Sequence, residues 1–228
     1  MCPCRPVSES VAPFRVSQQT RNQGADMIRI PATATLLVIL ASPAGAAARP
    51  NSRSANLTVR VADAPGTRGI DFSAALDQAR MILDDAGITI TWMNCRAGMS
   101  ANDCQLPLRD NEVIVRLVSA NLSNSAGMVT MGVSLVDPRA RHSSLASVYV
   151  DLVERAARAA AIDARKLLGR AVAHEIGHLL LNTNTHARGG LMRATWSRVE
   201  MQRDESADWL FADQEGEAMR NGLHGPRQ

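Results

Sequence analysis

The apolar segment from Leu167 to Leu180 most restricts how this chain can fold. Its apolar residues recur at helical spacing and cover a broad surface, which predicts a helix packed on most sides, with Asp163 as a possible N-cap. These residues are Leu167, Leu168, Ala171, Val172, Ile176, Leu179 and Leu180. The same helix contains His174, Glu175 and His178. Burying these three side chains costs several kcal/mol unless each is paired or bound to a metal. The folded protein must therefore supply partners or a metal ion for them.

A His-Glu-x-x-His motif gives this helix the spacing of a metal site. His174 and His178 are four positions apart, so both imidazoles project from one helical face and can reach one ion. Glu175 lies about 100° around the helix from His174, which lets it hold a metal-bound water without being a ligand itself. Each residue alone is compatible with ordinary packing, but the joint spacing indicates a metal site.

A third ligand can come from the stretch Asn-Thr-Asn-Thr-His that follows the helix. Asn182 or Asn184 can adopt the left-handed conformation that ends a helix, which would turn His186 back toward the same ion. The competing ligand is Glu200, 22 residues beyond His178, in a later helix. His186 is the preferred ligand because a neutral imidazole needs no charge compensation. Three imidazoles with one open position are typical of catalytic zinc.

The sequence His-Glu-Ile-Gly-His, the third histidine and a following Gly-Gly-Leu-Met resemble the zinc-binding helix and methionine turn of the metzincin metallopeptidases. They also resemble small exported bacterial proteins with the motif His-Glu-Ile-Gly-His-Leu-Leu-Leu. The resemblance covers residues 174 to 196. It implies a zincin fold with Met192 as a hydrophobic floor beneath the metal ligands. The implied site consists of Zn²⁺ on His174, His178 and His186, with Glu175 as general base.

Two features depart from the metzincin pattern. That pattern has glycine three residues after its second histidine and its third histidine three residues further on, but these positions are Leu181 and Asn184 here. The third histidine therefore comes two residues late, which a longer turn can accommodate. The tyrosine that some metzincins have after the methionine turn is also replaced, because Trp196 occupies that neighbourhood.

These features predict a secreted or periplasmic zinc metalloprotease, a hydrolase that cleaves peptide bonds. Zinc would polarise the peptide carbonyl and activate a water, while Glu175 takes the proton and returns it to the leaving amine. A peptide or protein substrate would lie extended against an edge strand, at 130–136 or 145–151. The alternatives are an exported, non-catalytic, zinc-stabilised peptide-binding domain and a zinc hydrolase acting on a non-protein amide. Glu175 favours catalysis because a structural zinc site has no use for a general base.

The rest of the chain reads as strand, helix, several strands and then helices. Leu57, Val59 and Val61 alternate inward along a first strand, and a helix from Phe72 to about Ala86 follows, with Asp71 as a possible cap. Further strands are expected at 88–94, 112–118, 131–137 and 146–153, with a helix over 153–161. This order predicts an α+β, zincin-like or metzincin-like fold with a mixed twisted sheet, an active-site helix and a small C-terminal helical part.

Residues 47–228 are expected to form a single catalytic domain, which suits a chain of 228 residues. Residues 27–46 have the charge, apolar run and small residues of a signal peptide, so residues 1–26 are a doubtful extension and translation is expected to start at Met27. Export favours a disulfide between Cys95 and Cys104 over a contribution of these cysteines to a metal site.

The charge balance limits the classes of partner. Four basic and two acidic residues precede position 47, which leaves 21 against 20 and a net charge of +1. This balance gives no electrostatic case for nucleic acid or an anionic membrane surface. The apolar run at 30–41 is too short to span a bilayer, so no permanent membrane anchor is expected, and the chain is expected to be a monomer.

Overall fold

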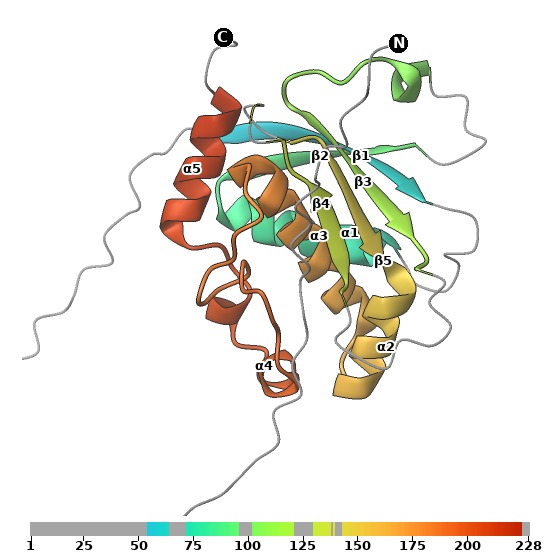
Figure 1. Cartoon of the computed structure of the whole chain (residues 1–228), viewed down its shortest axis with the longest axis vertical. Coiled ribbons are helices and arrows are strands. Elements are labelled where there is room, and N and C mark those ends of the chain that lie inside the picture. The colour runs from blue at the N-terminus through green and yellow to red at the C-terminus, as the bar shows by residue number, and fades with distance from the viewer. Residues whose placement is uncertain are drawn as a thin grey trace, which may run out of the picture.

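The computed structural model describes residues 54–63, 72–95, 102–120, 130–137, 139 and 143–224. The predicted signal peptide, the preceding extension and the Asp71 cap lie outside these residues. Within them, one five-stranded sheet is covered on one face by two helices that pack against each other (Figure 1). These are α1 (Phe72–Asp85) and α3 (Ala164–Leu181). The predicted α+β architecture with a mixed sheet is therefore confirmed.

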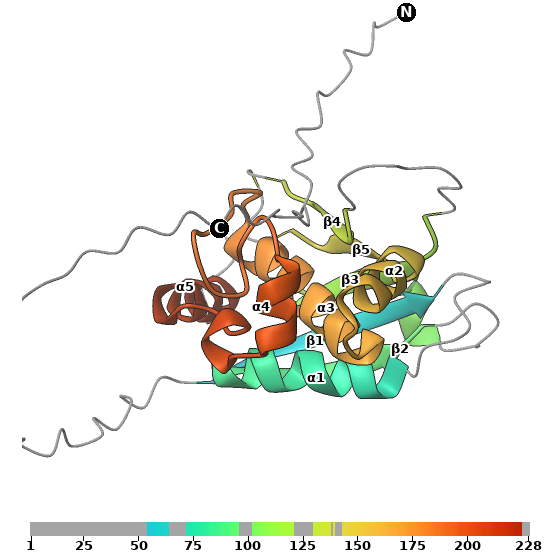
Figure 2. The same cartoon turned by 90° about the horizontal axis from the view of Figure 1, so that it is seen from below.

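The sheet has the strand order β2-β1-β3-β5-β4, and β4 runs antiparallel to β5 while the other pairs are parallel. The strands are β1 (Ala55–Asp63), β2 (Ile88–Asn94), β3 (Glu112–Val118), β4 (Gly132–Leu135) and β5 (Leu145–Tyr149). Leu57, Val59 and Val61 are buried on the helix-covered face, as their alternation predicts. Figure 2 shows β4 at the edge of the sheet, beyond β5.

Two predictions about this sheet are wrong. The expected strand over 146–153 ends at Tyr149, because Val150, Val153 and Ala157 are buried at helical spacing and belong to α2 (Val150–Ala160). The segment 145–151 also cannot offer an edge to a substrate, since β5 lies between β3 and β4. Of the two edge segments considered, only 130–136 contains an edge strand.

The C-terminal part is helical, as predicted. It consists of α4 (Arg198–Arg203), a short 3-10 turn (Ser206–Asp208) and α5 (Asp213–His224). α5 contacts α3, and α4 contacts α2. Among the residues that the structure describes, no helix has both the length and the apolar character needed to cross a membrane.

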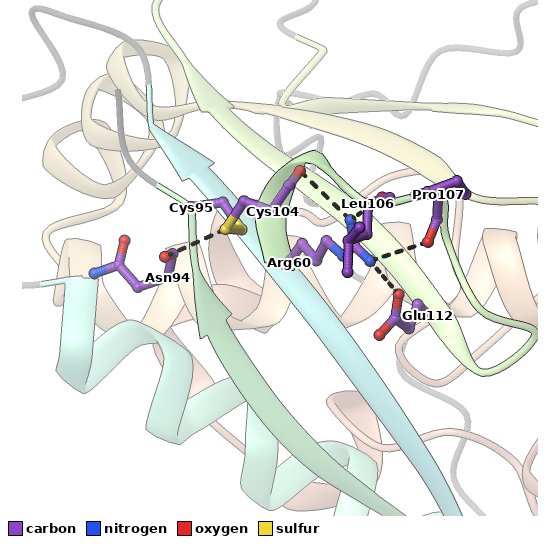
Figure 3. The surroundings of a disulfide bond; sticks show 7 residues. All are labelled: Arg60, Asn94, Cys95, Cys104, Leu106, Pro107 and Glu112. Atoms are coloured by element: carbon purple, nitrogen blue, oxygen red, sulfur yellow. Dashed lines mark hydrogen bonds and ion pairs between the residues drawn. A yellow bond between two sulfur atoms is a disulfide. The ribbon is translucent and has the colours of Figure 1, made fainter. Parts of the chain in front are cut away.

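A disulfide joins Cys95, just after β2, to Cys104 in the 3-10 turn Asn102–Gln105, which confirms the predicted pairing (Figure 3). Arg60 of β1 holds the segment 104–107, which begins at the disulfide, over the sheet. Its guanidinium donates to the carbonyl oxygen of Leu106 at 2.7 Å and to the carboxylate of Glu112 at 2.5 Å. Arg60 and Glu112 are both buried, so this ion pair anchors the segment from inside the protein.

Candidate metal centre

Helix α3 supplies the first part of the site and is more completely buried than its sequence pattern suggests. Every residue from Leu167 to Leu180 is buried. The side chain of Asp163 accepts a hydrogen bond from the backbone N–H of Arg165 at 2.9 Å, so the predicted N-cap is present. At the other end, Asn182 adopts the left-handed conformation with φ 50° and ψ 43°. The helix therefore ends at the predicted turn.

His174, His178 and His186 lie together and form what we call the histidine cluster. The Nε2 atom of His178 is 3.0 Å from Nε2 of His174 and 3.3 Å from Nε2 of His186. One ligand atom from each residue lies within 4.8 Å of the other two. A tetrahedral zinc ion about 2.0–2.1 Å from each imidazole nitrogen requires nitrogens roughly 3.3 Å apart. The separations of His178 from the other two imidazoles fit this requirement.

Backbone carbonyls orient two of the three rings. Nδ1 of His174 donates to the carbonyl oxygen of Leu191 at 2.9 Å, and Nδ1 of His178 donates to that of Thr183 at 2.7 Å. Because a carbonyl oxygen can only accept, the proton of each neutral ring sits on Nδ1. The Nε2 lone pairs therefore remain available inside the cluster, which is the arrangement that metal-binding histidines use.

Burial keeps the histidine cluster in its neutral, ligating form. Desolvation lowers the pKa of His174 well below its ordinary range and the pKa of His178 to about 4, and it also lowers the pKa of His186. Neutral imidazole is the form that binds metal, so no proton has to leave at neutral pH. The donor set, its spacing and its protonation state all fit zinc.

Glu175 follows His174 on the helix and is also buried. Its side chain lies against β4, where the hydroxyl of Ser134 donates to Oε2 at 2.6 Å. Burial raises the pKa of Glu175 from 4.5 to about 8, and the hydrogen bond from Ser134 opposes this rise. A cation held by the neighbouring histidines would lower this pKa and favour the carboxylate form, which can accept a proton.

Met192 packs against the turn of α3 that carries the two histidines. A Cβ atom on Gly177 would lie 2.7 Å from Sδ of Met192 and 2.6 Å from the ring of Phe211, so only glycine leaves room for both side chains. Met192 is fully enclosed, and its carbonyl oxygen accepts a hydrogen bond from the N–H of Ala187 at 2.9 Å. This contact closes the turn after His186 and keeps Met192 beneath the helix.

Trp196 occupies the neighbourhood where some metzincins have a tyrosine. Its ring is completely buried and meets His174 edge to face, with ring centroids 5.6 Å apart. Trp209 packs against Trp196 in turn, at 5.1 Å. The indole of Trp196 therefore forms an apolar wall of the site beside His174.

Glu200, the competing third ligand, lies outside the histidine cluster. Its carboxylate accepts a hydrogen bond from the backbone N–H of Ser197 at 2.7 Å, and the Ser197 hydroxyl accepts one from the N–H of Glu200 at 3.2 Å. This reciprocal pair is a capping box at the start of α4. The capping role accounts for Glu200 without any metal.

Four groups around the site were not identified from the sequence. Two are the carbonyl groups of Leu191 and Thr183, and backbone acceptors have no sequence signature. The other two are Gly132 and Ser134 of β4, which face Glu175. Their alternate positions in a predicted strand show that they share a face, and this was the available signal. It did not show which helix that face would meet.

No family model and no curated protein matches the sequence. The solved structures similar to this chain include three metallopeptidases. Archaemetzincin from Methanopyrus kandleri has a TM-score of 0.49 and 15% identity over 75% of this chain and 98% of that protein. Metalloproteinase-II from Bacteroides fragilis has a TM-score of 0.47 and 15% identity over 77% of this chain and 56% of that protein. A zinc-dependent peptidase from Methanocorpusculum labreanum has a TM-score of 0.43 and 12% identity over 71% of this chain and 99% of that protein.

Proposed function

We propose that this protein is an exported zinc-dependent endopeptidase. The observation that carries the proposal is the histidine cluster, in which three neutral imidazoles converge beside a buried carboxyl group. His174, His178 and His186 would hold the zinc ion. Because three protein ligands leave one position of a tetrahedral ion open, the donor set suits a catalytic zinc better than a structural one.

Zinc bound there would supply Lewis acidity, polarising a substrate carbonyl and making a water molecule more acidic. Glu175 would act as general base and then as general acid. Its carboxylate would take a proton from the attacking water and return it to the nitrogen of the leaving amine. Trp196 would keep bulk water away from the histidine cluster, since it is completely buried beside His174.

The substrate would be a peptide or protein in extended conformation. β4 is the last strand at its side of the described sheet, and one of its two edges is paired with β5. An extended peptide could add to the other edge through backbone hydrogen bonds. β4 also carries Gly132 and Ser134, which contact Glu175, so a peptide bound there would lie close to the proposed base.

The protein would act outside the cytoplasm as a monomer, without nucleic acid or a permanent membrane anchor. The disulfide between Cys95 and Cys104 supports an oxidising compartment. The test is to measure the zinc content of the exported protein by mass spectrometry and to incubate it with a mixed peptide library. One zinc per chain and cleavage of peptide bonds are expected. Zinc without cleavage would instead favour a peptide-binding domain or a hydrolase of non-protein amides.

A further inference from the structure

Two residues of the edge strand contact the two carboxylate oxygens of Glu175. The hydroxyl of Ser134 lies 2.6 Å from Oε2 and 2.9 Å from the backbone carbonyl oxygen of the same glutamate. A Cβ atom on Gly132 would lie 2.5 Å from Oε1 and 2.7 Å from Cδ. Gly132 and Ser134 are two positions apart, so both face α3 from the same side of the strand.

The two residues restrict Glu175 in different ways. Ser134 is buried, and its hydroxyl lies closer to Oε2 than to the carbonyl oxygen of Glu175, so the shorter hydrogen bond holds one side of the carboxylate. Gly132 offers no side chain, and any larger residue would occupy the place of Oε1 and Cγ. The conformation of Glu175 is thus defined by β4 rather than by α3 alone.

We propose that Ser134 is a positioning residue for the reaction: its hydrogen bond to Oε2 fixes the carboxylate of Glu175, the proposed base, and Gly132 leaves the space that Oε1 occupies. The inference rests on the proposed function of Glu175 as general base. A glutamate side chain has three rotatable bonds, and a base must lie within about 2.6–3.2 Å of the proton that it takes. Displacing a catalytic group by about 1 Å can cost on the order of a hundredfold in rate.

The arrangement also connects substrate binding with the orientation of the base. β4, the strand that would pair with a peptide, also holds the carboxylate of Glu175. The same strand would therefore position both the peptide and the base. A residue that only satisfied a buried carboxyl group would influence stability alone. A positioning residue must in addition change kcat while leaving KM and zinc binding unchanged.

The experiment compares Ser134→Ala, Ser134→Cys and Gly132→Ala in the full chain. Cysteine keeps the side chain in place but is a weak donor, so it tests the hydrogen bond if the alanine variant folds poorly. Ser147→Ala is the matched control, because Ser147 lies on the neighbouring strand opposite Val133 and so on the other face of the sheet. Zinc content, kcat, KM and urea unfolding are measured for each variant, alone and combined with Glu175→Gln.

We expect one zinc per chain in all variants and a kcat lowered at least about tenfold in both Ser134 variants and in Gly132→Ala, with KM unchanged. Ser147→Ala should match the wild type. Combining Ser134→Ala with Glu175→Gln should lower kcat no further than Glu175→Gln alone. The unfolding midpoints should likewise be non-additive, which requires no activity at all.

Wild-type kcat in both Ser134 variants, or additive effects with Glu175→Gln, would overturn the positioning role while leaving the peptidase intact. An inactive wild-type protein that binds zinc would instead refute the proposed function, and the catalytic role of Ser134 with it. In that case, additive unfolding midpoints would further show that Ser134 does not hold Glu175 at all.

Discussion

Nδ1 of His174 donates a hydrogen bond to the carbonyl oxygen of Leu191 at 2.9 Å, which links the first proposed ligand to the segment that follows the histidine cluster. Leu191 is itself held by the backbone, because its N–H donates to the carbonyl oxygen of Leu210 at 2.9 Å. The next side chain but one, Arg193, is paired with Asp208 at 3.0 Å. The orientation of His174 therefore depends on contacts between residues 191–193 and 208–210.

Removing the Asp208 carboxylate should weaken this link. In Asp208→Ala, the buried guanidinium of Arg193 loses its closest acidic partner, so we expect lower stability and a zinc affinity reduced by about tenfold. The matched control is Asp77→Ala, because Asp77 forms an exposed ion pair with Arg80. Competition with a fluorescent zinc chelator measures both affinities. An unchanged affinity in Asp208→Ala would show that this ion pair does not support the site.

The third ligand can be tested by comparing His186→Ala with Glu200→Ala. His186 contributes an Nε2 atom to the histidine cluster, so its loss should lower zinc affinity by orders of magnitude. Glu200 closes a capping box, so its loss should cost about 1 kcal/mol of unfolding free energy and leave zinc affinity unchanged. Equal losses of affinity, or a larger one in Glu200→Ala, would assign the third ligand to the carboxylate.

Much of this site follows from local sequence. The helical spacing of His174 and His178, the end of α3 at Asn182 and the return of His186 all depend on residues within about one turn of each other. The metzincin-like pattern would end the helix at position 181, but Leu181 is still helical and the chain reverses at Asn182. The reversal comes one residue later because asparagine, unlike leucine, readily adopts the left-handed conformation.

The remaining contacts depend on tertiary structure. Ser134 meets Glu175 only because β4 pairs with β5 and lies over α3, and strand order is not encoded in the alternation of a single strand. The start of α2 at Val150 was missed for a related reason. A short apolar run at the end of a strand does not reveal whether the next residues continue the strand or begin a helix.

The metal-free protein should lose stability as pH rises, through Glu175. Burial raises the pKa of this carboxyl from 4.5 to about 8. Between these values the folded chain binds more protons than the unfolded chain, so the free energy of unfolding falls as pH increases. Relative to metal-free Glu175→Gln, the wild type should lose up to about 1.4 kcal/mol per pH unit between pH 5 and about pH 8. Urea unfolding of both proteins at several pH values measures this difference, and parallel curves would contradict it.

Arg60 should contribute more than the disulfide between Cys95 and Cys104 to anchoring the segment 104–107 over the sheet. Arg60→Met removes the closest cationic partner of the buried Glu112 carboxylate and leaves it the backbone N–H and the more distant guanidinium of Arg109, so a loss of about 3 kcal/mol, the lower end of the range for breaking a buried ion pair, is expected. Replacing Cys95 and Cys104 together by serine removes a cross-link over 9 residues, for which about 2–3 kcal/mol is expected. Guanidinium unfolding compares the two variants. A greater loss in the cysteine variant would show that the disulfide, and not the ion pair, anchors the segment.

The most direct test of the account is Glu175→Gln in the zinc-loaded protein, with zinc content and peptide cleavage measured on the same sample. Glutamine keeps the shape of the side chain and removes the base, so one zinc per chain should remain while cleavage falls by about a hundredfold or more. Cleavage at the wild-type rate in Glu175→Gln would contradict the role of Glu175. A wild-type protein that binds one zinc and cleaves no peptide in a broad library would contradict the peptidase itself.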